Sequence, residues 1–252
     1  MSQRDEAILR LIAVHRYATT RQLQLLVFTD HASAASAART CSRVLLRLHA
    51  SGLLDTLERR VGGIRAGSAG RIWHLTHAGS RLLSFLDGDG YQATRFQEPS
   101  QRLLDHSLMV TDIHLTLRSA AVQHGFEIVA VQHEPESWRA FTGQGGQRRL
   151  IRPDLFVVTA TNEYEDSWAL EADTGSEHPP TVVRSCKRYL SYHHTGIEQQ
   201  AHGVFPRVVW VVPHAARAAK LDAAFTSARL DRDLFRITTL DRLGDLIAGG
   251  AG

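Results

Sequence analysis

Residues 208–212, Val-Val-Trp-Val-Val, form a run that contains no polar residue. A strand with one face in water would alternate apolar and polar side chains, so this run is typical of a central strand covered on both faces. Helical patterns at 179–193 and about 215–230 flank the run, and another strand pattern follows at 235–239. The run therefore predicts a sheet packed between helices.

The segment ahead of the run extends this domain. Residues 102–124 have the apolar spacing of a helix, and residues 143–146 form a glycine-containing turn. Strand patterns occur at 126–132, 155–158 and 168–173. The expected order is helix, three strands, helix, strand, helix and strand. It predicts an α/β (α+β) domain with a mixed sheet over residues 101–252.

The first part of the chain has a different pattern. Helical segments occur at 4–16, 21–28 and 33–50, where Thr19-Thr20 and Ser33 are suitable capping residues. Two strand patterns separated by a glycine-rich turn follow, and then another helix. This order resembles a winged helix-turn-helix domain. The resemblance implies a DNA-binding domain over residues 1–86, joined by a linker over residues 87–100.

Charge differs between the two parts. Residues 1–86 hold 12 Arg and 5 acidic residues, whereas residues 87–252 hold 17 basic and 21 acidic residues. A basic first part and an acidic second part fit a nucleic-acid-binding domain joined to a domain that carries carboxylates. Chance variation in surface composition is the alternative.

The third helical segment has two contrasting stripes, one apolar and one of Arg, Ser and Thr. Arginine can bind guanine edges or phosphates, and hydroxyls reach backbone oxygens, so this segment is the expected recognition helix for double-stranded DNA. Arginines of the wing are expected on phosphates or in the minor groove. The expected DNA-binding residues are Arg39, Thr40, Arg43, Arg47, Arg59, Arg60, Arg65 and Arg71. A winged helix used only for protein contacts is the alternative.

Three carboxylates lie at the ends of predicted neighbouring strands. Asp154 begins one strand, and Glu171 and Asp173 lie two residues apart on the next, so their side chains share a face while Leu170 and Ala172 face the packed side. Converging carboxylates repel each other unless a cation or a proton compensates. Mg²⁺ or Mn²⁺, which prefers oxygen ligands, is the natural occupant and can activate a bound water.

These residues resemble the PD-(D/E)xK nuclease superfamily through Pro153, Asp154 and Glu171. Position 173 departs from the pattern, because it is Asp where the pattern has Lys. Some members of that superfamily carry the lysine on the following helix, where this chain has Lys187. The resemblance implies that Asp154, Glu171 and Asp173 hold the metal and that Lys187 assists them in catalysis.

A vestigial site is the alternative to a catalytic one. In it, Asp154 and Glu171 would cap strand ends or pair with Arg152 and Arg184. Asp173 would bind the turn that follows it, and Lys187 would be a solvated helix residue.

Three longer motifs support a resemblance that spans nearly the whole chain. The winged helix is joined to Arg-Pro-Asp-Leu at 152–155, Leu-Glu-Ala-Asp-Thr-Gly-Ser-Glu at 170–177, and Cys-Lys-Arg-Tyr-Leu-Ser-Tyr at 186–192. Together they resemble the replication-relaxation family of plasmids and integrative elements. This resemblance implies action at a specific DNA site in plasmid replication or conjugative transfer of a mobile element.

Three functions fit these features. The first is a metal-dependent nickase or endonuclease of the relaxase kind, and the second is a non-catalytic origin-binding initiator or accessory protein that recruits other transfer or replication proteins. The third is a transcriptional regulator that binds an operator. A homodimer is possible in each, because winged helices often dimerise.

Three further features of the sequence bear on the location of the protein, its cysteines and its possible nucleophile. No apolar run approaches the ~18 residues of a membrane span, and the charged start predicts no signal peptide, so a cytoplasmic protein is expected. Cys41 and Cys186 lie on apolar stripes and are expected to be buried. Tyr189 and Tyr192 are poor candidates for a relaxase nucleophile, because the sequence has no His-hydrophobe-His metal motif.

Overall fold

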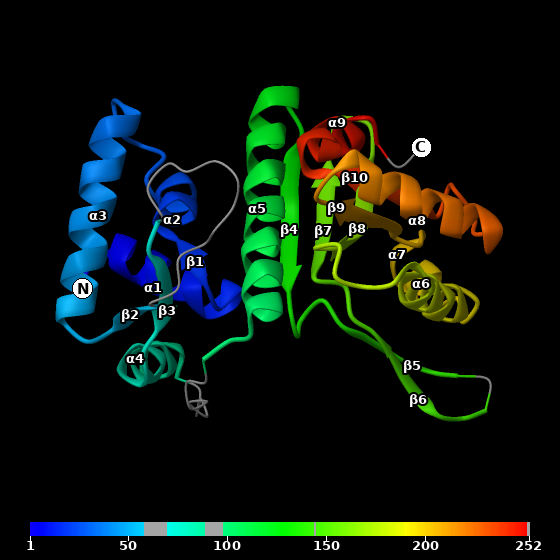
Figure 1. Ribbon diagram of the computed structural model, residues 1–252, viewed down its shortest axis with the longest axis horizontal. Helices are drawn as coiled ribbons and strands as arrows, with labels where there is room; N and C mark the ends of the chain where they lie inside the picture. Colours follow the sequence, from blue (N-terminus) through cyan, green and yellow to red (C-terminus); the bar gives the residue numbers. More distant parts are fainter. Residues whose placement is uncertain (58–69, 89–97, 144, 251–252) are drawn as a thin grey trace. The chain divides into compact units, whose positions relative to one another are not determined.

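The computed structural model describes residues 1–57, 70–88, 98–143 and 145–250, and the chain divides into two compact units, residues 1–111 and 112–252 (Figure 1). The division falls within α5 (Gln101–His124) rather than at the expected linker. Residues 89–97 of that linker lie outside the described residues.

The start of α5 belongs to the first unit because its apolar side chains pack there. Leu104 and Leu108 form a buried cluster with Tyr17, Leu57 and Ile72. The side-chain amide of Gln22 donates a buried hydrogen bond of 2.9 Å to the carbonyl of Leu108.

Among its described residues, the first unit has the three helices, the two antiparallel strands and the fourth helix that the sequence predicts, and also a two-residue strand between the first two helices that the sequence did not predict. Its elements are α1 (Gln3–His15), β1 (Ala18–Thr19), α2 (Thr20–Val27), α3 (Ala34–Ala50), β2 (Leu54–Leu57), β3 (Ile72–Leu75) and α4 (His77–Asp87). The strands pair in the order β1-β3-β2. Thr19 and Ser33 cap α2 and α3 as expected, because each hydroxyl accepts a hydrogen bond from the backbone N–H three residues later.

The core of this unit joins one stripe from each helix. Side chains at helical spacing on α1, α2 and α3 pack on Trp73 of β3. The buried side chains include Ile8, Leu9, Ile12, Leu23, Cys41 and Leu45.

The second unit is built on a five-stranded mixed sheet in the order β10-β9-β8-β7-β4, so the predicted mixed α/β fold is confirmed. Its strands are β4 (Glu127–His133), β7 (Leu155–Ala160), β8 (Glu165–Ala172), β9 (Arg207–Val212) and β10 (Phe235–Thr239). Pairs β4–β7 and β7–β8 are antiparallel, whereas β8–β9 and β9–β10 are parallel. All six residues of β9 are buried, which confirms the interior strand expected from the Val-rich run.

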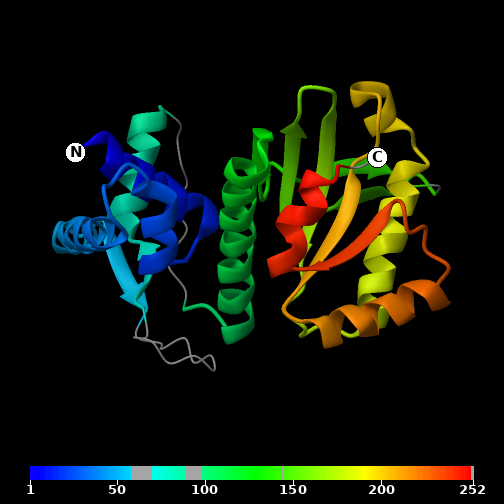
Figure 2. The ribbon, with the colours of Figure 1, turned by 90° about the horizontal axis from the view of Figure 1, so that it is seen from above.

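Helices cover both faces of this sheet (Figure 2). One face carries α6 (Pro179–His193) and α8 (Ala215–Ser227), whose apolar residues join the same buried cluster as Ala169 and Val208. The other face carries the second part of α5 and α9 (Leu243–Ala248). Helix α7 (Ile197–His202) and the 3₁₀ turn Leu240–Arg242 complete the unit.

A separate two-stranded ribbon, β5 (Arg139–Thr142) and β6 (Arg148–Ile151), is inserted between β4 and β7 (Figure 1). The sequence predicted only the turn at its tip. None of the described helices combines the length and apolar character that crossing a membrane requires.

Candidate functional site

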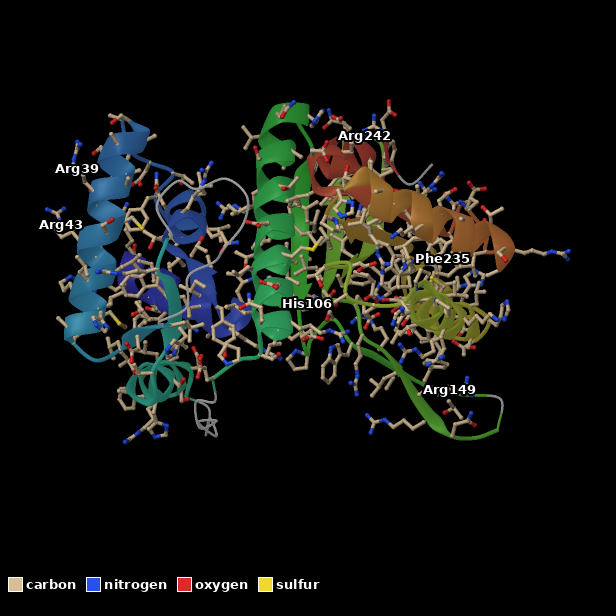
Figure 3. All side chains as sticks on the ribbon, viewed as in Figure 1. Arg39, Arg43, His106, Arg149, Phe235 and Arg242 are labelled. Atoms are coloured by element: carbon tan, nitrogen blue, oxygen red, sulfur yellow. The ribbon has the colours of Figure 1, made fainter. Side chains whose placement is uncertain are left out.

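The exposed face of α3 carries two arginines, Arg39 and Arg43, four residues apart on one side of the helix (Figure 3). Thr40 beside them is half-buried. Among the residues that the structure describes, no ion pair engages Arg39 or Arg43. The opposite side of α3 is packed in the core through Cys41 and Leu45. The helix therefore presents two guanidinium groups to solvent on a rigid support.

Arg47 lies on the same helix but has a different environment. Its guanidinium donates a 2.5 Å hydrogen bond to Asp5, whose side chain is 2% exposed. Asp5 also accepts a hydrogen bond from the backbone N–H of Ser2 and so closes the capping box of α1. Burial alone would raise the pKa of Asp5, but the hydrogen bonds from Arg47 and Ser2 outweigh it and lower the pKa. Arg47 thus ties α3 to the start of α1.

The predicted wing is only partly described. Arg59, Arg60 and Arg65 lie outside the described residues. Arg71 is exposed just before β3, and its backbone carbonyl accepts a hydrogen bond of 3.1 Å from the N–H of Thr20.

In the second unit, Asp154 and Glu171 lie opposite each other on antiparallel neighbours. Leu155 pairs with Leu170 in the β7–β8 register, and the N–H of Asp154 donates a hydrogen bond of 3.0 Å to the carbonyl of Leu170. Opposite residues of antiparallel strands share a face, so the two carboxylates meet there. One oxygen of Asp154 also accepts a hydrogen bond of 2.7 Å from the N–H of Ala172.

Glu171 is held by α6. The hydroxyl of Tyr189 donates a hydrogen bond of 2.5 Å to Oε1 of Glu171. Burial, and then the charge of Asp154, raise the pKa of Glu171 well above its usual range, while the Tyr189 hydrogen bond and the charge of Arg188 oppose that rise only in part. Burial and the neighbouring Glu171 also raise the pKa of the Tyr189 hydroxyl well above its usual value. These surroundings therefore shift the protonation equilibrium of Glu171 toward the neutral carboxyl.

Asp173 lies just beyond β8 and is engaged by α8. Its Oδ2 accepts hydrogen bonds from Nε and Nη2 of Arg217 at 2.9 and 2.7 Å, and both side chains are buried. Its Oδ1 accepts a bond of 2.6 Å from the N–H of Gly175. Arg217 also donates to the carbonyl of Glu177 at 2.7 Å. Asp173 therefore binds the following turn, as the alternative for this residue expected, and both of its oxygens have protein donors.

Glu171 and Asp173 contact elements on the same face of the sheet, α6 and α8, as the strand alternation predicts. Leu170 and Ala172 are both buried on the other face, as expected, and helices cover both faces of the sheet.

Lys187 is exposed on α6 and faces away from Glu171. Lys187 lies two positions before Tyr189 on the helix, which corresponds to a rotation of about 200° about the helix axis. Its side chain lines a surface pocket of about 410 Å³ between α6 and α8. The pocket residues are Pro180, Val183, Arg184, Lys187, Ala224, Ser227 and Ala228. The basic side chain whose charge acts on Glu171 is Arg188.

Sequence reasoning missed the roles of Tyr189, Arg188 and Arg217. Tyr189 lies on the buried stripe of α6 with Val182 and Cys186, and a polar atom on such a stripe signals a buried partner. Arg217 carries no comparable signal, because its partner Asp173 is 44 residues away in the sequence.

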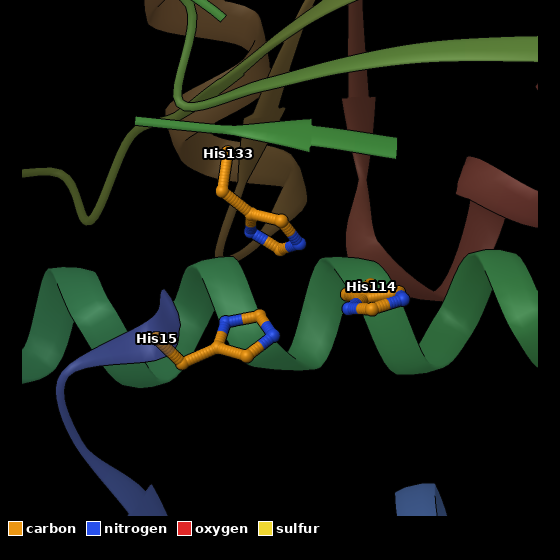
Figure 4. Close-up of side chains that lie close together, drawn as sticks. All are labelled: His15, His114 and His133. Carbon is orange, nitrogen blue, oxygen red and sulfur yellow. The ribbon is translucent and has the colours of Figure 1, made fainter. Parts of the chain in front are cut away.

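A pair of histidines lies between α5 and β4. The rings of His114 and His133 have centroids 5.3 Å apart (Figure 4). Burial lowers the pKa of each to about 4, and for His114 the neighbouring His133 contributes as well. Both imidazoles are therefore neutral at neutral pH.

A sequence model described as replication-relaxation matches residues 9–208. No curated protein matches the chain. The solved structure of the restriction endonuclease FokI is similar over 99% of this chain and 45% of that chain, at 10% sequence identity and a TM-score of 0.32. The chain thus spans less than half the length of that protein.

Proposed function

This chain belongs to the replication-relaxation family, and from that premise we propose that it binds a specific double-stranded DNA site, an origin or an operator, during replication or conjugative transfer of a mobile element. The observation that carries the proposal is the pair Arg39 and Arg43 on the solvent face of α3. In this proposal the first unit is a winged helix-turn-helix domain and α3 its recognition helix.

The charge and geometry of the first unit support DNA binding. Residues 1–86 carry 12 Arg against 5 acidic residues, and an α-helix fits the major groove of B-DNA. Arg39 and Arg43 are available for base edges or phosphates, whereas Arg47 is held by Asp5. The proposed DNA contact on α3 therefore centres on two arginines.

In the first version of this function the second unit does not cut DNA. A divalent metal needs ionised carboxylates with free lone pairs. Asp173 is bound by Arg217 and Gly175, and Lys187 faces another surface, so two of the four residues expected in catalysis are engaged or placed elsewhere. The protein would then be an origin-binding initiator or accessory protein, whose second unit grips DNA or recruits other transfer or replication proteins.

A metal-dependent nickase or endonuclease is the second candidate, favoured by the pairing of Asp154 with Glu171. Two carboxylates on one face offer oxygen ligands that suit Mg²⁺ or Mn²⁺. Such an ion would supply a water of lowered pKa. For it to bind, Glu171 must first lose its proton, so metal affinity would rise with pH.

A plasmid assay separates the two candidates. Supercoiled DNA that carries the element's own origin is incubated with Mg²⁺, Mn²⁺ or EDTA, and with the parent, Glu171→Gln or Glu165→Gln. Glu165 is exposed at the far end of the same strand, so its variant is a matched control. Site-specific binding without cutting under every condition supports the initiator. Metal-dependent nicking that Glu171→Gln abolishes and Glu165→Gln retains overturns it in favour of the nickase.

A transcriptional regulator remains the third possibility, and the location of the bound site distinguishes it. If the bound protein protects a promoter upstream of transfer genes from nuclease digestion, rather than an origin, that result would favour the regulator. Light scattering of the free and DNA-bound protein would test the possible homodimer.

A further inference from the structure

The β5–β6 ribbon is anchored at its base and exposed along its length. Phe141 and Ile151 are buried in the cluster that includes α6, and the Phe141 ring lies 5.2 Å from that of Tyr192. Arg139 donates a hydrogen bond of 3.0 Å to buried Glu198, and its guanidinium lies over the ring of Phe156. The base of the ribbon is therefore fixed to the domain, and Arg139 serves that attachment.

Strand alternation gives the ribbon a solvent face that carries arginine. Arg148, Leu150 and Arg152 alternate along β6 and beyond its end, and Thr142 lies opposite Arg148 in the register. Arg148, Arg152 and Thr142 are all exposed. The guanidinium of Arg152 lies 4.6 Å from the ring of Trp138, which holds it in place on this side.

Arg149 adds a cation near the tip, on the opposite face (Figure 3). It pairs with Phe141 in the register, and its side chain crosses Gly143. A Cβ at position 143 would lie 2.8 Å from Nε of Arg149, so the glycine permits this close approach.

The charge of the ribbon is opposite to that of its domain. Residues 137–153 contain four Arg and no acidic residue, whereas residues 112–252 as a whole contain 15 basic and 17 acidic residues. Within the described part of the chain, no ion pair engages Arg148 or Arg149. Two unpaired cations concentrated on an exposed element of an acidic domain create a local site for a polyanion.

We propose that the β5–β6 ribbon binds the phosphodiester backbone of DNA through Arg148 and Arg149, as a contact separate from α3. The inference rests on the proposed DNA-binding function and gives its second unit a DNA contact of its own. Arginine suits phosphate oxygens through its planar fork of donors, and the major groove admits a two-stranded ribbon. Arg152 precedes Asp154 by two residues, so the ribbon leads directly into the strand that carries the carboxylate pair.

The test measures binding of the full-length protein to a fluorescent DNA duplex of unrelated sequence, and to one of its single strands, over a range of NaCl concentrations. The variants are Arg148→Ala/Arg149→Ala and its charge-retaining counterpart Arg148→Lys/Arg149→Lys. Lys220→Ala/Arg242→Ala is the matched control, because it removes two exposed charges from the same unit away from the ribbon. Thermal unfolding of each variant checks that the fold is retained.

The alanine pair should weaken duplex binding and lower the slope of log affinity against log salt by about 2, because each phosphate contact contributes about 0.9 to the slope. The loss of duplex affinity in the alanine pair, relative to the parent, should therefore shrink roughly tenfold between about 50 and about 200 mM salt. The lysine pair should keep most of the slope, and the control should bind as the parent does.

Equal affinity and slope for the parent and the alanine pair, on both duplex and single strand, would overturn the ribbon contact. Under that result the proposed function survives if Arg39→Ala or Arg43→Ala still weakens binding. A parent that binds neither probe nor the element's origin would instead refute the proposed function, and the ribbon contact with it. A loss of affinity confined to the single strand would support backbone binding and identify single-stranded DNA as the ribbon's ligand.

Discussion

The hydroxyl of Tyr189 on α6 lies 2.5 Å from Oε1 of Glu171 on β8 and donates a hydrogen bond to it. Tyr189 is 2% exposed, so this bond satisfies a buried hydroxyl and fixes the carboxyl at the end of the strand. The same helix turns Lys187 to another surface. Helix α6 therefore supplies the carboxyl site with a tyrosine instead of the lysine that the sequence motif suggested.

Replacing Tyr189 by Phe should destabilise the protein by about 1–2 kcal/mol, because a buried hydrogen bond is lost while the ring is kept. Urea unfolding measures this free energy. Tyr164→Phe is the control, since Tyr164 is 46% exposed, and it should change the free energy by much less. Equal effects of the two substitutions would show that the Tyr189 bond contributes nothing.

The stability of the parent relative to Glu171→Gln should fall as pH rises. The folded state raises the pKa of Glu171, so its contribution to stability is complete below the usual glutamate pKa and is lost as pH rises through the folded value. Gln cannot ionise and keeps an oxygen for Tyr189. Unfolding free energies across the acid-to-neutral range measure the difference, with Glu165→Gln as the control. A difference independent of pH would contradict the raised pKa.

Asp173→Ala should destabilise the second unit by about 3–5 kcal/mol, because it leaves the buried guanidinium of Arg217 without its carboxylate. Asp233→Ala removes an acid from the exposed pair with Arg236 and should cost less than about 1 kcal/mol. Denaturant unfolding compares them. If Asp173 instead served mainly a metal, Asp173→Ala would leave stability intact and abolish only metal binding.

Arg43→Ala should affect DNA binding, whereas Arg47→Ala should affect the stability of the fold. Arg43 is exposed on α3 without an ion pair to the described residues, so its loss should weaken specific DNA binding by about 1–3 kcal/mol at a base contact and leave stability unchanged. Arg47→Ala removes a hydrogen bond from buried Asp5 and should lower the unfolding temperature. Fluorescence anisotropy and thermal unfolding separate the two effects. If Arg43→Ala bound its site as tightly as the parent does, α3 would not be the recognition helix.

The sequence by itself determined most of the longer local elements, although it did not predict the β5–β6 ribbon. The Val-rich run predicted an interior strand because its apolar residues fill both sides of the strand, and β9 is buried throughout. Thr19 and Ser33 identified helix starts because capping depends on a hydroxyl and a backbone N–H three residues away. Alternation along β8, continued to the residue after it, correctly placed Glu171 and Asp173 on one face.

Only the tertiary structure decided which partner each carboxylate has. Glu171 and Tyr189 are 18 residues apart, and Asp173 and Arg217 are 44 apart, so no local period relates them. Their meeting depends on how α6 and α8 lie across the sheet. A capping bond or a strand alternation is set by neighbours within a few residues, whereas the burial, charge and hydrogen bonds that decide a carboxyl's protonation come from elements brought together by packing.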